Sequence, residues 1–209
     1  ISRERPYIKG EGAFWEMFRF ARSQKKFDRW FHDLRESPKY KIMEEIGLYI
    51  ADPHSPSLSV KEEAFMNNLA EKIPLIGRFI KGSERAYVGY LNKMRVDLFS
   101  RGADLLEAKG KTIENSKKDY EGLASWVNNS TGRGKMAESL EKAAPLLNSI
   151  LFTPRLIASR LNILNPLYYA KLPKEIRIMA LKDMAKFIGF GISVLALAKL
   201  NGADVDDDP

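Results

Sequence analysis

Residues 83–110 read SERAYVGYLNKMRVDLFSRGADLLEAKG. Apolar side chains return in this stretch at the three- and four-residue spacing of one helix face. They are Tyr87, Tyr90, Leu91, Met94, Leu98 and Leu105. Ser83 is suited to cap the N-terminus of a helix, and Lys109-Gly110 is suited to end one. The stretch therefore predicts one long amphipathic helix, and with it a helical fold.

Two apolar stripes precede it. The first comprises Phe14, Met17, Phe18 and Ala21, and the second comprises Phe27, Trp30, Phe31 and Leu34. At 100° per residue the two stripes point in different directions, so one straight helix cannot bury both. We therefore predict a break at Ser23, which caps the second helix. Ser37-Pro38 predicts the start of a third helix, and Gly47 its end.

The connection to the long helix contains a loop and a further predicted helix. Residues 52–57 read DPHSPS, a composition typical of loops. Ser59 and Glu62 have the spacing of a capping box, in which each side chain binds the other's free backbone N–H. The helix that they open is expected to end before Pro74.

The remainder of the chain also predicts helices. They are residues 116–128, residues 136–147, one beginning at Thr153-Pro154, a short one at Asn165-Pro166, and a long one from Pro173 to Asn201-Gly202. Residues 128–134, NNSTGRG, predict an irregular loop with glycines that can take positive φ. No stretch has the period-2 alternation of a strand.

The predicted fold class is all-α: an irregular bundle of about eight to ten helices, with the long apolar C-terminal helix in the core. The loops divide it into an N-terminal helical part, residues 1–110, and a C-terminal helical part, residues 111–209. One continuous domain is the alternative. The start at Ile1 and the acidic end at Asp206-Asp207-Asp208-Pro209 are interpreted as cut points in a longer chain.

Composition argues against an enzyme. The chain has 209 residues, 44% hydrophobic and 29% charged, as in folded globular proteins. It has no cysteine, which excludes disulfides, thiol nucleophiles and cysteine-based metal sites. Its two histidines, His32 and His54, do not form a metal-binding spacing. We expect no catalytic residues, cofactor, metal site or small-molecule substrate.

Basic residues are concentrated in the last third of the chain. The net charge is +7, and between Lys135 and Lys199 ten basic residues face four acidic ones. In the stretch Thr131-Gly132-Arg133-Gly134-Lys135, glycines followed by a helix could hold a phosphate, although the pattern is not a Walker A motif. The alternative, which we favour, is a helix–helix connection that needs glycine geometry. The candidate anion- or nucleic-acid-binding residues are Arg133, Lys135, Arg155, Arg160, Lys174 and Arg177.

A second basic stripe lies near the N-terminus. Arg19, Arg22, Lys26 and Arg29 would share one face of a continuous helix, interleaved with Trp15, Phe18 and Phe27. Such a face would suit nucleic acid or anionic lipid. The predicted break at Ser23 divides the stripe, and an ordinary solvated face is the alternative.

Residues 187–198 contain no charged side chain. Twelve helical residues span about 18 Å, whereas the hydrocarbon core of a bilayer is about 30 Å thick. A transmembrane helix is therefore not expected, and a helix in a bundle core or an oligomer interface is. Gly189 and Gly191 could permit a close helix approach. The candidate oligomer or membrane interface comprises Phe187, Phe190, Ile192 and Leu195.

Several stretches together resemble a known family. They are 82–87 GSERAY, 91–99 LNKMRVDLF, 131–134 TGRG, 144–148 APLLN, 152–160 FTPRLIASR, 165–166 NP and 202–205 GADV. This ordered series is similar to a recurrent signature of the large polyvalent proteins of phages and prophages, and it covers most of the chain, from about residue 14 to residue 204.

The resemblance implies a helical module without assigned catalysis, within a multidomain protein of the phage virion or of the bacterial cytoplasm after injection. It marks Arg85, Arg95, Arg155 and Arg160 as pattern positions, and pairing with acids or helix C-termini is the structural explanation. We expect a scaffold or assembly module whose partners are other copies or other domains of the same protein. The alternatives are a nucleic-acid-binding module that contacts DNA through the basic C-terminal third, and a membrane-active element of genome ejection.

Overall fold

The computed structural model describes residues 11–52, 74–134 and 154–203. Within these ranges the chain forms eight α-helices and no strand, so the predicted all-α multi-helix bundle is confirmed. They are α1 (Glu11–Arg22), α2 (Gln24–Arg35), α3 (Pro38–Glu45), α5 (Pro74–Glu107), α6 (Ile113–Ser130), α9 (Pro154–Leu164), α10 (Pro166–Lys171) and α11 (Lys174–Leu200).

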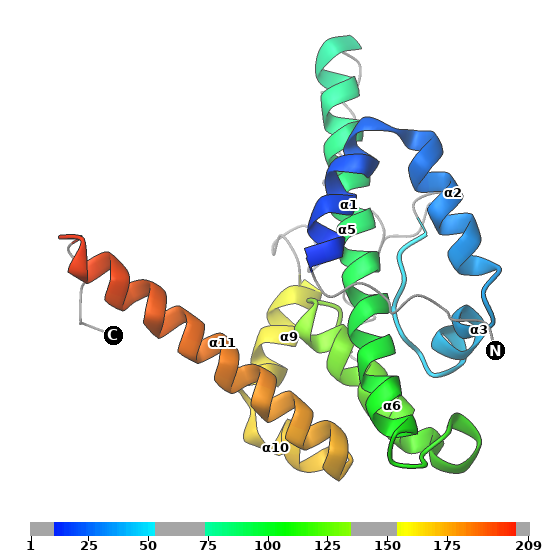
Figure 1. Ribbon diagram of the computed structural model, residues 1–209, viewed down its shortest axis with the longest axis vertical. Helices are drawn as coiled ribbons and strands as arrows, with labels where there is room; N and C mark the ends of the chain where they lie inside the picture. The colour runs from blue at the N-terminus through cyan, green and yellow to red at the C-terminus, as the bar shows by residue number, and fades with distance from the viewer. Residues whose placement is uncertain (1–10, 53–73, 135–153, 204–209) are drawn as a thin grey trace.

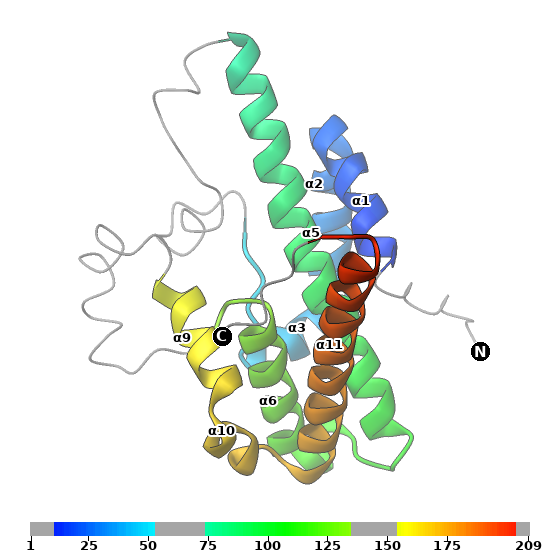
Figure 2. The same cartoon turned by 90° about the vertical axis from the view of Figure 1, so that its left-hand side faces the viewer.

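α5 runs through the length of the molecule (Figure 1). α1 and α2 lie along its N-terminal half, whereas α6 and α9–α11 gather around its C-terminal half (Figures 1 and 2). Three breaks follow the predicted capping chemistry. Ser23, Ser37 and Asn165 are the N-caps of α2, α3 and α10, and each side chain accepts a hydrogen bond from a backbone N–H of its helix.

Glycine ends four helices. Gly47, Gly110, Gly132 and Gly202 all have positive φ, between 72° and 81°. The first, second and fourth were predicted helix ends, and the third lies in the predicted loop. Downstream, α9 and α10 begin at the predicted Pro154 and Pro166, and α11 begins directly after the predicted Pro173.

The start of α5 differs from the prediction. The helix begins at Pro74 and passes through Gly82 and Ser83 without a break, so Ser83 is not its N-cap. A Cβ at Gly82 would stand 3.1 Å from the carbonyl oxygen of Ala21, and one at Gly89 would stand 2.4 Å from the ring of Phe20. These glycines, seven residues apart on one helix face, allow α1 to lie close against α5.

The main core joins the two predicted parts of the chain. It contains Met43 of α3, Phe99 of α5, Leu123 of α6 and Ile176 of α11, each less than 5% exposed. α5 packs on α6, and α6 packs on α9 and α11. Side chains from both sides of residue 110 thus share one hydrophobic cluster.

The prediction that the long C-terminal helix lies in the core was wrong for most of its length. Only the first turns of α11 reach the core, where Ile176 and Ala180 are buried. From Phe187 onward the helix extends beyond the other helices, and its apolar side chains are exposed (Figure 1). The predicted helices within residues 59–73 and 136–147 lie outside the described residues.

Candidate functional site

The candidate interface of α11 lies together on the part of the helix that extends from the bundle. Phe187 is 69% exposed, Phe190 70%, Ile192 62% and Leu195 54%. Ile188, Val194, Leu197 and Leu200 are exposed as well. We call residues 187–200 the projecting half of α11. Every side of this half presents apolar atoms, since all residues from Phe187 to Leu197 are exposed.

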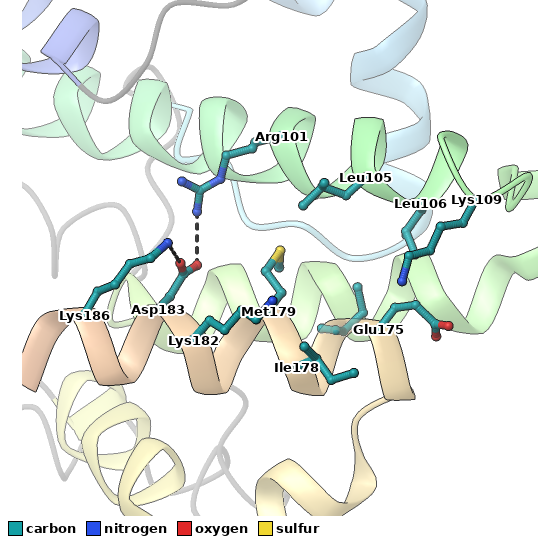
Figure 3. A pocket seen from close by; sticks show the side chains of 12 residues that line it. Arg101, Leu105, Leu106, Lys109, Glu175, Ile178, Met179, Lys182, Asp183 and Lys186 are labelled. Atoms are coloured by element: carbon teal, nitrogen blue, oxygen red, sulfur yellow. Dashed lines mark hydrogen bonds and ion pairs between the residues drawn. The ribbon is translucent and has the colours of Figure 1, made fainter.

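The first half of α11 is firmly held. Lys111 Nζ lies 2.8 Å from Asp119 Oδ2 and 2.8 Å from Glu175 Oε2, and it thereby ties the start of α11 to α6. The Lys111 ammonium lowers the pKa of the Glu175 carboxyl, and the hydrogen bonds to both acids raise the pKa of Lys111. About two turns further on, Arg101 of α5 donates to Asp183 at 3.0 Å (Figure 3). The projecting half therefore extends from a fixed base.

A cleft of about 370 Å³ separates α5 from this first half. Leu105 and Met179 line it together with Arg101, Glu175 and Asp183 (Figure 3). Both carboxylates are already paired with cations, Glu175 with Lys111 and Asp183 with Arg101 and Lys186. The cleft therefore presents no pair of convergent carboxylates suited to acid–base chemistry.

Gly189 and Gly191 differ from the other helical glycines whose surroundings are described. A Cβ at Gly82, Gly89, Gly102 or Gly122 would meet a neighbouring element at 3.1 Å or less. At Gly189 and Gly191, by contrast, no described atom lies within 4 Å of the position of a Cβ. Glycine in an exposed helix costs about 0.5–1 kcal/mol relative to alanine. Nothing in the described fold requires that cost at these two positions.

The hydropathy of the helices bears on whether α11 could cross a membrane. Among the described residues, no helix has a stretch long and apolar enough to cross a membrane. This agrees with the prediction, made from the length of the uncharged stretch at residues 187–198, that this helix does not span a membrane.

The TGRG loop forms the C-terminal cap of α6. Gly132, at φ +79°, donates to Asn129 O at 3.2 Å, and Arg133 N donates to Asn128 O at 2.7 Å. This is the Schellman arrangement, which requires positive φ at the glycine. Gly134 N donates to Ser159 Oγ of α9 at 2.7 Å. The loop N–H groups thus bind the protein itself, in agreement with the favoured interpretation as a helix–helix connection.

The side chain of Arg133 is buried beside a second buried arginine. Arg133 and Arg95 both place their guanidinium groups over the ring of Tyr49, at 4.7 and 5.0 Å from its centroid. Arg95 is completely buried, and its Nε donates to Thr131 Oγ1 at 3.0 Å. The cluster joins α5, the end of α6 and the segment after α3, which is a structural role for Arg133.

The remaining basic candidates are dispersed over several elements. Arg160 of α9 and Lys174 at the start of α11 are exposed, whereas Arg155 is half-buried. Arg177 donates to Ala170 O at 2.8 Å and to Leu172 O at 3.0 Å. Lys135 lies outside the described residues. Anion binding by these residues stays a prediction.

Arginines at the ends of helices form a pattern that the sequence indicated only in part. Arg85 Nη2 donates to Ala21 O at the end of α1, and Arg95 Nη2 donates to Thr131 O at the end of α6. Arg177 does the same at the end of α10. A cation at a helix C-terminus is favoured by the helix dipole. The structural explanation proposed for Arg85 and Arg95 is confirmed, although nothing in the sequence identified which helix each would cap.

The sequence did not predict the hollow at the junction of α1 and α2. It has a volume of about 520 Å³ and is lined by Trp15, Phe18, Arg19, Arg22 and Lys26. The two helices break at Ser23 as predicted, yet three cations of the N-terminal stripe still line one hollow. Phe27 lies instead in the core, at 0% exposure.

Within the described ranges, no group of three or more histidine, aspartate or glutamate side chains is placed to hold a metal ion. Comparison with known proteins finds no matching family model, no matching curated protein and no matching solved structure.

Proposed function

We propose that this chain is a non-enzymatic helical assembly module, and that the projecting half of α11 is its contact with a second copy. The observation that carries the proposal is the exposure of Phe187, Phe190, Ile192 and Leu195 on a helix whose base is fixed to the bundle. An exposed apolar patch of this kind marks an interaction site.

The two glycines support a helix as the partner. Small residues permit two helix backbones to approach closely, and Gly189 and Gly191 have open space where a Cβ would stand. Residues two apart lie on different sides of a helix, so one of the two glycines would face the partner helix. Full burial of a large apolar side chain contributes about 1.5–3 kcal/mol. Association costs roughly 4–15 kcal/mol. Because a symmetric contact contains each candidate side chain twice, the apolar burial expected for two copies is of the same order as that cost.

The setting of the proposal is a phage-derived polyvalent protein of the virion or of the injected material. Its support is the ordered series of sequence stretches, from GSERAY at residues 82–87 to GADV at residues 202–205. Arg85 and Arg95, two positions of that series, bind the ends of helices, so part of the signature supports a helical framework.

Light scattering of the purified chain at low and high salt, with and without a short DNA duplex, tests the proposal. We expect a defined oligomer that DNA leaves unchanged. Ile192→Lys places a charge in the contact and is expected to give a monomer. Leu161→Lys, on α9, is the matched control, because Leu161 is 64% exposed and Ile192 62%.

A monomeric wild-type chain would overturn the assembly proposal. If that monomer bound DNA at low salt and released it at high salt, the basic C-terminal third would become the favoured surface. If the monomer instead released the contents of anionic vesicles, and Ile192→Lys abolished the release, the projecting half would be a membrane-active element.

A further inference from the structure

We propose that the hollow at the α1–α2 junction binds single-stranded nucleic acid, with a base on Trp15 and the flanking phosphates on Arg22 and Lys26. This site is separate from α11 and from the proposed assembly function. The aromatic residues, the two cations without an ion pair among the described residues, and the open hollow that they line carry the inference together.

The aromatic part is a group of exposed rings on one side of α1. Trp15 is 67% exposed, Phe14 48% and Phe18 43%. Their centroids lie 5.3–6.0 Å apart, so the three rings hold one another in place. α1 already buries Ala13 and Phe20 on its other side. The exposed rings are therefore not needed to attach α1 to the bundle, and their free faces suit the stacking of bases.

Two of the three cations beside these rings form no ion pair within the described part of the chain. Arg19 forms an ion pair with Glu16, three residues earlier. Arg22 and Lys26, by contrast, are exposed, and neither side chain forms an ion pair with any described residue. Both line the same hollow as Trp15 and Phe18. The surface therefore combines apolar rings with unpaired positive charge.

The start of α2 adds to this charge. Its first turn contains Gln24, Lys25 and Lys26 and no acidic residue. Acidic side chains normally stabilise the first turn of a helix, because the helix dipole is positive there. Two lysines at this position are locally unfavourable, and a bound anion would offset that cost. A phosphate held by Lys26 would lie next to the first turn of α2.

The shape favours nucleic acid over a lipid surface. An interfacial helix presents a continuous apolar face to the bilayer. Trp15, Phe18, Arg19, Arg22 and Lys26 instead line an open hollow of about 520 Å³. A hollow of this size accepts a flat base, and the cations around it can reach the backbone on either side. Stacking and phosphate pairing require no particular base, so we expect little sequence preference.

Fluorescence anisotropy of a labelled oligo-dT of about twelve nucleotides tests the site. We expect binding that weakens with salt, with a slope of log Kd against log salt concentration of about 1.4–2.1, as two to three phosphate contacts require. Trp15→Ala is expected to weaken binding about tenfold and Trp15→Phe much less, since a phenyl ring still stacks. Arg22→Gln is expected to reduce both the affinity and the salt slope, and Arg22→Lys to retain most of each.

Lys118→Gln on α6 is the matched control, because Lys118 is also exposed and lies outside the hollow. Equal loss of binding in Lys118→Gln and Arg22→Gln would show that net charge alone attracts the strand, and would overturn the site. Equal affinity in Trp15→Ala and wild type would also overturn it. The site would also be overturned if oligo-dT did not bind and the chain instead bound vesicles of phosphatidylcholine and phosphatidylglycerol through Trp15. Circular dichroism of each variant confirms that it is folded.

Discussion

Asn92 and Ala51 exchange two hydrogen bonds: the side-chain Oδ1 accepts from Ala51 N at 2.9 Å, and Nδ2 donates to Ala51 O at 2.7 Å. Asn128 does the same for the preceding residues, since it accepts from Tyr49 N and donates to Gly47 O. An asparagine of α5 and one of α6 thus bind an extended segment that has no strand beside it. Side chains thus satisfy four backbone groups of residues 47–51, whereas Gly47 N and Leu48 N donate to backbone carbonyls of α3.

Replacing Asn92 with alanine is therefore expected to be costly. The change leaves the buried N–H and C=O of Ala51 without these bonds, at about 1–3 kcal/mol for each group. We expect the free energy of unfolding to fall by about 2–4 kcal/mol in urea denaturation. Asn115→Ala, at an exposed asparagine that binds Thr112 N, is the control and is expected to lose about 1 kcal/mol or less. Similar losses in the two variants would contradict this role for Asn92.

Gly89→Ala is expected to disturb the contact of α1 with α5. The added Cβ would stand 2.4 Å from Phe20 Cδ2, so the ring or the whole of α1 must shift. Overpacking of this kind costs about 1–3 kcal/mol. Gly191→Ala meets no described atom, and in a monomeric background such as Ile192→Lys it is expected to stabilise the helix by about 0.5–1 kcal/mol. Thermal unfolding of both variants tests the contrast, and a stabilised Gly89→Ala would refute the close approach.

Arg95→Lys is expected to destabilise the chain by about 1–3 kcal/mol. The planar guanidinium lies over Tyr49 and also donates to Thr131, and an ammonium group cannot make both contacts. Arg101→Lys is the control, because Arg101 forms an exposed pair with Asp183, and such pairs contribute about 1 kcal/mol at most. Equal denaturation midpoints for Arg95→Lys and the wild type would show that the buried arginine has no structural role.

The attachment of α11 is expected to weaken in acid. Lys111 lowers the pKa of Glu175 below its ordinary value of 4.5, so the folded state holds this carboxylate ionised more strongly than the unfolded chain does. The stability that Glu175 contributes is present above that ordinary value and is lost as the pH falls through the lowered one. The raised pKa of Lys111 has no effect in this range, because that group loses its proton only in strong base.

Chemical denaturation from about pH 6 to about pH 3 measures this effect. We expect the wild type to be more stable than Glu175→Gln near the upper pH, and this difference in the free energy of unfolding to shrink as the pH is lowered. Glu44→Gln is the control for the removal of one carboxylate, since Glu44 lies exposed on α3. A constant difference between wild type and Glu175→Gln would exclude the Lys111 pair as its source.

Much of the helical layout could be predicted because local chemistry determines where helices begin and end. Ser23, Ser37 and Asn165 each accept a backbone N–H of the helix that they precede, and Gly47 takes the positive φ that a helix C-terminus favours. These interactions involve residues within five positions of one another. They are therefore visible in the sequence without knowledge of the tertiary fold.

The candidate sites could be predicted less well, because they depend less on local sequence pattern. The sequence identified the uncharged stretch at residues 187–198 as an interface candidate, but it could not reveal that this half of α11 extends out of the bundle. It likewise placed Arg133 among anion-binding candidates, whereas the side chain is buried against Tyr49. Exposure depends on which elements pack against a helix, and hydrophobic periodicity does not contain that information.

The sequence by itself determined that this protein is helical, where most of its helices break, and that residues 187–198 form an uncharged apolar segment. Only the tertiary structure decided that Gly82 continues a helix, because its lack of a side chain is used by α1, some sixty residues away in the chain. The same holds for Arg22 and Lys26, which line one hollow although Ser23 separates their helices. Capping and periodicity act between near neighbours, whereas close approach, burial and shared surfaces arise from contacts between distant segments.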